Sequence, residues 1–191
     1  MIKKEKLDVL YKKMSSELNK EMVFGDGNPE SGILFLGEAP GGDEIRLGKP
    51  FVGKAGKNLD SFMNSINIDR TKCYVSNAVK FRPTKISPSG NTVNATPTWN
   101  DVQTFRPYLI EEISIIKPKL IVTMGGIPAK SIFNKENTFM GTIHGKLQHV
   151  DEFNCDVFCL YHPASVIYNQ NLLSTYNMDL EILKNILKEI S

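Results

Sequence analysis

Residues 33–41, ILFLGEAPG, carry the clearest structural signal in the chain. The short apolar run of residues 33–36 predicts a buried strand. The Gly- and Pro-rich stretch that follows, residues 37–56, is too long for a tight turn and too interrupted for regular structure. We therefore expect a strand that leads into a functional loop wrapped over its end.

On the C-terminal side of this strand, apolar runs alternate with helical spacings. Further strands are predicted at residues 73–76, 120–122 and 157–160, with amphipathic helical patterns between them. Such alternation requires right-handed crossovers and gives a mainly parallel sheet covered by helices on both faces. The predicted fold class is α/β, a three-layer α/β/α sandwich with a central, mainly parallel four-stranded sheet.

Three segments lie outside this alternation. Residues 1–20 have an amphipathic pattern that predicts an N-terminal helix packed against the main body. Residues 83–97, PTKISPSGNTVNATP, lack periodicity and predict a flexible loop. Thr98 suits the N-cap of the following helix, which Pro107 is expected to kink or restart.

The composition is that of an ordinary globular chain. Its 191 residues, 41% apolar and 23% charged, suit one domain over residues 1–191. A net charge of +2 excludes the strongly basic balance of a protein that coats nucleic acid non-specifically. The sequence has no apolar run of about 18 residues and no signal-like N-terminus. We expect a cytoplasmic monomer without membrane association.

The cysteines indicate a reducing compartment. Cys73, Cys155 and Cys159 are an odd and sparse set that forms no disulfide framework. Cys155 and Cys159 lie in a β-like run, which favours buried strand thiols over metal ligands. We assign no metal to them.

Polar residues follow three of the predicted strands: Glu38, Asn77 and His162. Because ligands in such sheets bind beyond the carboxyl ends of the strands, these side chains are expected to converge on one cleft. An amide offers a donor and an acceptor that match the imide edge of a pyrimidine, and the Phe51 ring provides a stacking face. The set suits a flat, polar, neutral ligand.

Each of these residues also has an ordinary structural explanation. Asn77 suits a turn or a cap, His162 and Phe51 suit the core, and Glu38 suits the surface. The order of the segments and their residue sequences, taken together, are more specific evidence of function than any single residue.

These segments resemble the family 4 uracil-DNA glycosylases, from about residue 24 to the C-terminus. The combination of GEAPG, PFVGxAG and a late HPxS-like segment is highly specific. The resemblance rests on residues 37–41 (GEAPG), 48–56 (GKPFVGKAG), 77–80 (NAVK), 106–109 (RPYL) and 162–165 (HPAS).

One departure from that family is large. Its members usually carry an iron-sulfur cluster held by four cysteines. The corresponding positions here are Phe81, Phe105 and the neighbourhood of Leu10 and Lys13. We therefore expect no cofactor, with Phe81 and Phe105 packing against each other or against the first helix.

The resemblance implies hydrolysis of the N-glycosidic bond of uracil in DNA after base flipping. It implies that Phe51 stacks on the base, that Asn77 recognises its imide edge, and that a neutral His162 donates to O2. Gly37 and Ala39 fall in the same base-binding segment. Since Ala39 occupies the place of the aspartate of better-known uracil glycosylases, another carboxylate must position the water. We favour Glu44, then Glu38, then Asp43.

The expected partner is uracil-containing DNA, single- or double-stranded. Val166 and Ile167 are expected to wedge into the vacated base stack. Lys85 and the loop around it are expected to assist. The predicted DNA-binding residues are Lys54, Lys80, Arg82 and Ser165.

Two other functions remain open from the sequence. The missing cluster cysteines favour a non-catalytic member of the fold that binds DNA or protein. A glycosylase for another deaminated base, such as hypoxanthine or xanthine, is the third hypothesis.

Overall fold

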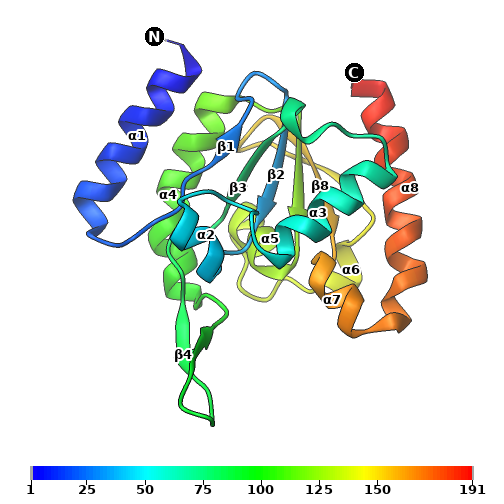
Figure 1. The fold of residues 1–191 in the computed structure, drawn as a ribbon. Coiled ribbons are helices and arrows are strands. Elements are labelled where there is room, and N and C mark those ends of the chain that lie inside the picture. Colours follow the sequence, from blue (N-terminus) through cyan, green and yellow to red (C-terminus); the bar gives the residue numbers. More distant parts are fainter. Residues whose placement is uncertain (1, 191) are drawn as a thin grey trace.

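The structure, a computed structural model, describes residues 2–190, without the side chains of residues 167 and 168. Helices and strands alternate along most of the chain (Figure 1). The α-helices are α1 Lys3–Leu18, α2 Gly42–Leu47, α3 Lys54–Ser65, α4 Trp99–Ile116, α5 Gly126–Phe133, α6 Met140–Ile143, α7 Pro163–Tyr168 and α8 Leu173–Ile190, with 3-10 turns η1 Arg70–Lys72 and η2 Gln170–Leu172. The strands are β1 Asp26–Gly27, β2 Ile33–Gly37, β3 Tyr74–Asn77, β4 Thr84–Ile86, β5 Thr92–Asn94, β6 Leu120–Met124, β7 Leu147–Val150 and β8 Cys155–Leu160.

The central sheet has the strand order β1-β3-β2-β6-β8-β7. The four predicted strands form its parallel middle, β3-β2-β6-β8, so the predicted fold class is confirmed. The predicted count of four strands was too low, because β1 and β7 add antiparallel edges. Strand β1 has only two residues and β7 is half exposed, so neither has the buried apolar pattern of the inner strands.

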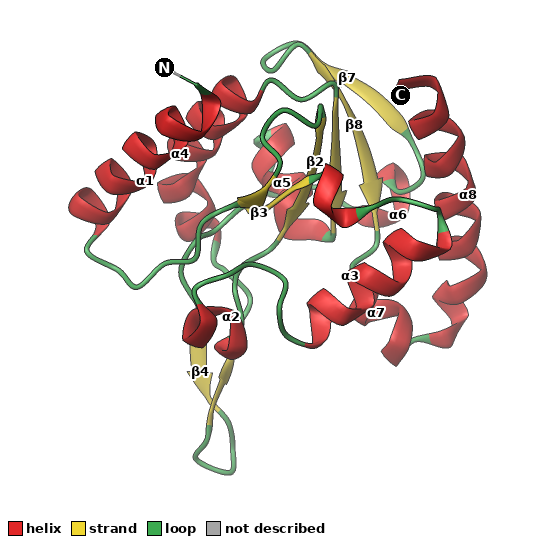
Figure 2. Ribbon diagram, turned by 45° about the horizontal axis from the view of Figure 1, so that its top comes forward, coloured by secondary structure: helices red, strands yellow, loops and turns green. Residues whose placement is uncertain are grey.

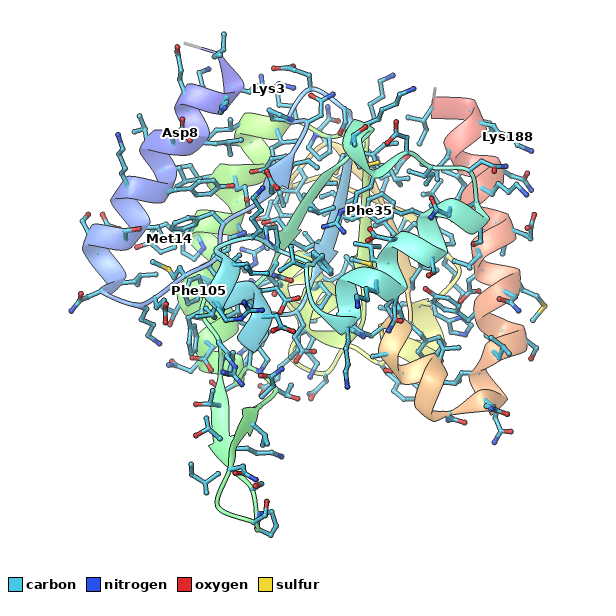
Figure 3. All side chains as sticks on the ribbon, in the orientation of Figure 1. Lys3, Asp8, Met14, Phe35, Phe105 and Lys188 are labelled. Carbon is cyan, nitrogen blue, oxygen red and sulfur yellow. The ribbon has the colours of Figure 1, made fainter. Side chains whose placement is uncertain are left out.

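Helices cover both faces of this sheet (Figure 2). Side chains of β2 alternate between the faces, with Leu34 and Leu36 on one and Phe35 on the other. The first face packs against α1, α4 and α5, and the second against α3, α7 and α8. Phe35 lies in the interior between the sheet and α3 (Figure 3), where its ring meets the Phe62 ring edge-on.

The structure modifies two local expectations. Residues 84–94 are not an irregular loop, because β4 and β5 pair as an antiparallel hairpin that projects from the body beside α2 (Figure 1). Pro107 does not restart its helix, since α4 runs unbroken from Trp99 to Ile116. Thr98 caps α4 as predicted, accepting from the Asp101 N–H at 3.1 Å while Asp101 accepts from the Thr98 N–H at 2.9 Å.

Candidate active site

A cavity of about 620 Å³ lies beyond the carboxyl ends of the parallel strands. Each of these strands provides a lining residue at or just after its end: Glu38 for β2, Asn77 for β3, Gly125 for β6 and His162 for β8. Ligands bind at this edge in open α/β sheets. The structure therefore brings Glu38, Asn77 and His162 together on one cleft.

Gly37 allows an aromatic ring and a carboxamide to meet. It is the register partner of Asn77, and Phe51 reaches the same place from the loop before α3. A Cβ atom on Gly37 would lie 2.4 Å from Phe51 Cζ and 2.6 Å from Asn77 Oδ1, closer than real side chains approach. Gly37 is not one of the lining residues, so its contribution is the space it leaves for Phe51 and Asn77.

His162 is fixed in one neutral form. Its Nδ1 accepts a hydrogen bond from the Ala164 N–H at 3.1 Å, which caps α7. The proton of the neutral ring is therefore on Nε2. Burial lowers the pKa of His162 and so favours the uncharged ring. The side chain can donate from Nε2 into the cavity without being charged.

Two of the three carboxylates that line the cavity, Glu38 and Glu44, differ in their surroundings. Glu44 is buried, and its oxygens accept from the backbone N–H groups of Gly41 at 3.1 Å and Gly53 at 2.9 Å. Among the described residues nothing donates to Glu38, and burial raises the pKa of its carboxyl. Glu44 thus braces the loop, whereas the Glu38 carboxylate is left available to a water molecule.

Asp43, the third candidate, also lines the cavity, but its carboxylate already has an ion-pair partner. It is exposed and forms an ion pair with Arg46 within α2, with 3.2 Å between Asp43 Oδ1 and Arg46 Nη2. Ala39 lines the cavity beside Glu38 and contributes only its backbone and a methyl group.

The prediction that Lys80 contacts DNA was wrong. Its side chain is 1% exposed, and its ammonium forms an ion pair with the buried Glu112 at 2.6 Å. It also donates to Ser76 and, at 2.8 Å, to the Asn77 carbonyl oxygen. A buried charge needs such partners. Lys80 therefore holds the Asn77 backbone through a hydrogen bond and presents no charge to a phosphate.

The other predicted DNA contacts lie at the cavity or its mouth. Lys54 and Ser165 are exposed and line the cavity. Arg82 packs its guanidinium against Gly42 and donates from Nε to Asn94 Oδ1 at 2.7 Å. Asn94, on the hairpin, also lines the cavity.

The predicted base wedge is not supported at Val166. This side chain is 6% exposed and belongs to the core cluster on the α3 and α8 side of the sheet. Phe51 is equally buried but lines the cavity, whereas Val166 does not line it. The side chain of Ile167 lies outside the described residues.

Comparisons with known proteins agree with this arrangement. The family model of the uracil DNA glycosylase superfamily matches residues 24–186. The chain belongs to this superfamily. It is 37% identical over 162 residues to the type-4 uracil-DNA glycosylase of Archaeoglobus fulgidus, covering 82% of this chain and 77% of that protein. It is 36% identical to the type-4 enzyme of Sulfurisphaera tokodaii, over 86% of this chain and 74% of that protein.

The positions that match the family's cluster ligands do not fit an iron-sulfur cluster. The Phe81 and Phe105 rings stack with centroids 5.7 Å apart and an interplanar angle of 25°, and Lys20 Nζ lies 3.7 Å from the Phe81 centroid. Leu10 is buried, and Lys13 forms an ion pair with Glu111 at 3.1 Å. A cluster needs thiolates, and apolar and cationic side chains occupy this place. The three cysteines are buried elsewhere, at or within β3 and β8.

Several residues at the site had no signal in the sequence. Asn94 and Ala95 line the cavity from a segment without periodicity, and Met140 and Tyr161 line it from the opposite side. Gly125 has a φ of 103°, which favours glycine, and a Cβ there would lie 3.3 Å from the His162 Cβ. These residues come together only through the strand order.

Proposed function

We propose that this member of the superfamily hydrolyses the N-glycosidic bond of uracil in DNA and leaves an abasic site. The observation that carries the proposal is the meeting of Phe51, Asn77 and His162 on one cavity of about 620 Å³. The Phe51 ring matches the face of a flipped uracil, and the Asn77 amide matches its imide edge. The neutral His162 ring matches its O2 oxygen as a hydrogen-bond donor.

Base capture precedes the chemistry. The nucleotide must leave the stack, at a cost of about a few kcal/mol in a duplex. Stacking on Phe51 and hydrogen bonding to Asn77 offset this cost. An amide held with its oxygen toward N3–H and its NH₂ toward O4 pairs with uracil, and in that one orientation it mismatches the N3 and amino group of cytosine.

Bond cleavage then places negative charge on the base. The electron pair of the breaking C1′–N1 bond moves into the uracil ring, and His162 donates from Nε2 to O2 as charge accumulates there. The sugar becomes oxocarbenium-like, as in other glycoside hydrolyses. A water molecule adds to C1′ and passes its proton to the Glu38 carboxylate. The raised pKa of Glu38 makes it a better proton acceptor than a solvated carboxylate.

DNA contacts are proposed for three cations, of which Lys54 and Lys85 are exposed and Arg82 is partly buried. Lys54 lies in the first turn of α3, and Arg82 and Lys85 lie at or on the hairpin. Phosphate contacts of this kind fix the register of the strand, while the pocket selects the base. A cytoplasmic location, a monomeric state and activity on single- or double-stranded DNA belong to the same proposal.

We also propose that the chain functions without an iron-sulfur cluster. The support is the stacked Phe81 and Phe105 pair at two of the ligand positions. Iron and sulfide analysis of protein purified under anaerobic conditions is expected to find no stoichiometric cluster. A full complement of iron and sulfide would contradict the proposal.

The direct test is an excision assay. Oligonucleotides with one uracil, single-stranded or in duplex, are incubated with the protein and then cleaved at abasic sites with alkali. Strand cleavage that depends on uracil and is lost in His162→Ala supports the proposal. Binding without cleavage would indicate a non-catalytic member, and cleavage only at hypoxanthine or xanthine would change the substrate.

The helices of residues 2–190 include none with the length and apolar character of a membrane span.

A further inference from the structure

Phe51 has a backbone conformation that its own side chain disfavours. Its φ is 55°, in the left-handed region that glycine and asparagine adopt far more readily than a bulky residue. Such a conformation persists only where the surroundings determine it, and it occurs often at functional sites. The backbone at this position sets where the proposed stacking ring points.

Arg70 is the main group that holds this backbone. Its Nη1 donates to the Phe51 carbonyl oxygen at 3.0 Å and its Nη2 to the Pro50 carbonyl oxygen at 3.1 Å. The same guanidinium is oriented by Asp60 on α3, with 2.7 Å between Nη1 and Oδ1. Arg70 and Asp60 do not line the active-site cavity, so they reach the ring only through the loop backbone.

Gly56 completes the support from the first turn of α3. A Cβ atom on Gly56 would lie 1.8 Å from the Phe51 carbonyl oxygen, so any other residue here would displace the loop. The carbonyl is thus confined between Gly56 and the Arg70 guanidinium. Two neighbours from different elements fix one peptide group.

We propose that Arg70, oriented by Asp60, is a positioning residue that holds Phe51 in the conformation required for stacking on the extruded base. The inference rests on the proposed function, since it assigns a purpose to the Phe51 ring. A planar fork donates to two successive carbonyls and a carboxylate together, which a lysine cannot do in the same geometry. The ion pair itself is half exposed, so its effect comes through the carbonyls rather than through charge.

The test compares Arg70→Ala and Arg70→Lys with a matched control, Arg106→Ala. Arg106 also donates to a carbonyl, that of Ser131 at 3.0 Å, and also pairs with a carboxylate, that of Glu152, but it lies on α4 away from the cavity. Thermal unfolding is measured for every variant. Single-turnover excision and inhibition by free uracil report on the pocket.

We expect Arg70→Ala to raise the half-saturating substrate concentration and the inhibition constant of uracil about tenfold, as partial loss of base stacking predicts. The maximal single-turnover rate is expected to change less. Arg70→Lys retains part of the effect of arginine, and Arg106→Ala leaves uracil inhibition unchanged. Equal changes in Arg70→Ala and Arg106→Ala would overturn the inference.

A double-mutant cycle separates positioning from general support. In a Phe51→Ala background, Arg70→Ala is expected to change uracil inhibition less than about twofold, because the group it positions is gone. The same fold-change in both backgrounds would overturn the inference.

A structural readout keeps the test independent of catalysis. If the parent protein excises no uracil, the proposed function fails, and crystal structures of the parent and Arg70→Ala decide the inference. Relaxation of Phe51 to negative φ in the variant supports it. An unchanged Phe51 conformation contradicts it.

Discussion

The floor of the cavity, supported by the buried ion pair of Lys80 and Glu112, and the hairpin β4–β5 differ in their burial. Lys80 and Glu112 are 1% and 0% exposed, and Lys80 donates to the Asn77 carbonyl oxygen. On the hairpin every residue of β4 is exposed, including Ile86 at 69%. Asn94, on strand β5 of the hairpin, lines the cavity and accepts from Arg82. In the proposed function, base recognition therefore depends on a buried, hydrogen-bonded interior, whereas contact with DNA falls to exposed side chains of the hairpin.

The largest effect is expected when the buried ion pair between Lys80 and Glu112 is removed. Lys80→Met leaves Glu112 as an uncompensated buried charge and is expected to lower the free energy of unfolding by about 3–5 kcal/mol. Chemical denaturation measures it. The control Lys13→Met removes an exposed ion pair with Glu111 and is expected to cost about 0–1 kcal/mol. A similar small loss for both variants would show that the floor is not held by its buried pair.

The next effect concerns two groups proposed to contact the base. His162→Ala and Asn77→Asp are each expected to reduce the single-turnover rate by about 10²–10³-fold, because each removes one preorganised contact to the charge or edge of the base. Thermal unfolding should change far less than in Lys80→Met. An Asn77→Asp variant as active as the parent would remove Asn77 from base recognition.

Variants of Glu38 and Glu44 are expected to differ in the pH dependence of their activity. Burial raises the pKa of Glu38, and the reaction requires its ionised form, so kcat/KM is expected to fall with decreasing pH from a higher value than a solvated carboxylate gives. Glu38→Gln is expected to be slow and to lose this acid limb, with little change in stability.

Glu44→Gln is the matched comparison. Its new NH₂ group would face the Gly41 or Gly53 N–H, leaving a buried donor unsatisfied at a cost of about 1–3 kcal/mol in stability. The acid limb should remain. An acid limb lost in Glu44→Gln and kept in Glu38→Gln would exchange the two roles.

The smallest effect is expected on the hairpin. Lys85→Ala and Arg82→Ala should weaken DNA binding uniformly across sequences and reduce the salt slope by about 1 for each phosphate that the side chain neutralises. Inhibition by free uracil should not change in Lys85→Ala. Lys12→Ala, an exposed lysine on α1, is the control. A slope that is the same for Lys85→Ala and Lys12→Ala would exclude a phosphate contact at the hairpin.

The sequence predicts the regions whose signals are local. Residues 33–36 and the other apolar runs are buried strands because continuous burial leaves a continuous apolar pattern. Glu38, Asn77 and His162 were found because they follow such strands. Lys80 was misassigned because a lysine in sequence carries no sign of a partner such as Glu112, 32 residues away. Arg70 was missed for the same reason.

The buried thiols of Cys73, Cys155 and Cys159 have a practical consequence for observing the hairpin at work. Burial raises the pKa of each to about 11, so almost none is present as the thiolate that attacks an alkylating reagent. The folded chain therefore has a chemically silent background for maleimide labelling. A fluorophore on a cysteine introduced at Ile86 would report DNA docking from a single site, without removal of any native thiol.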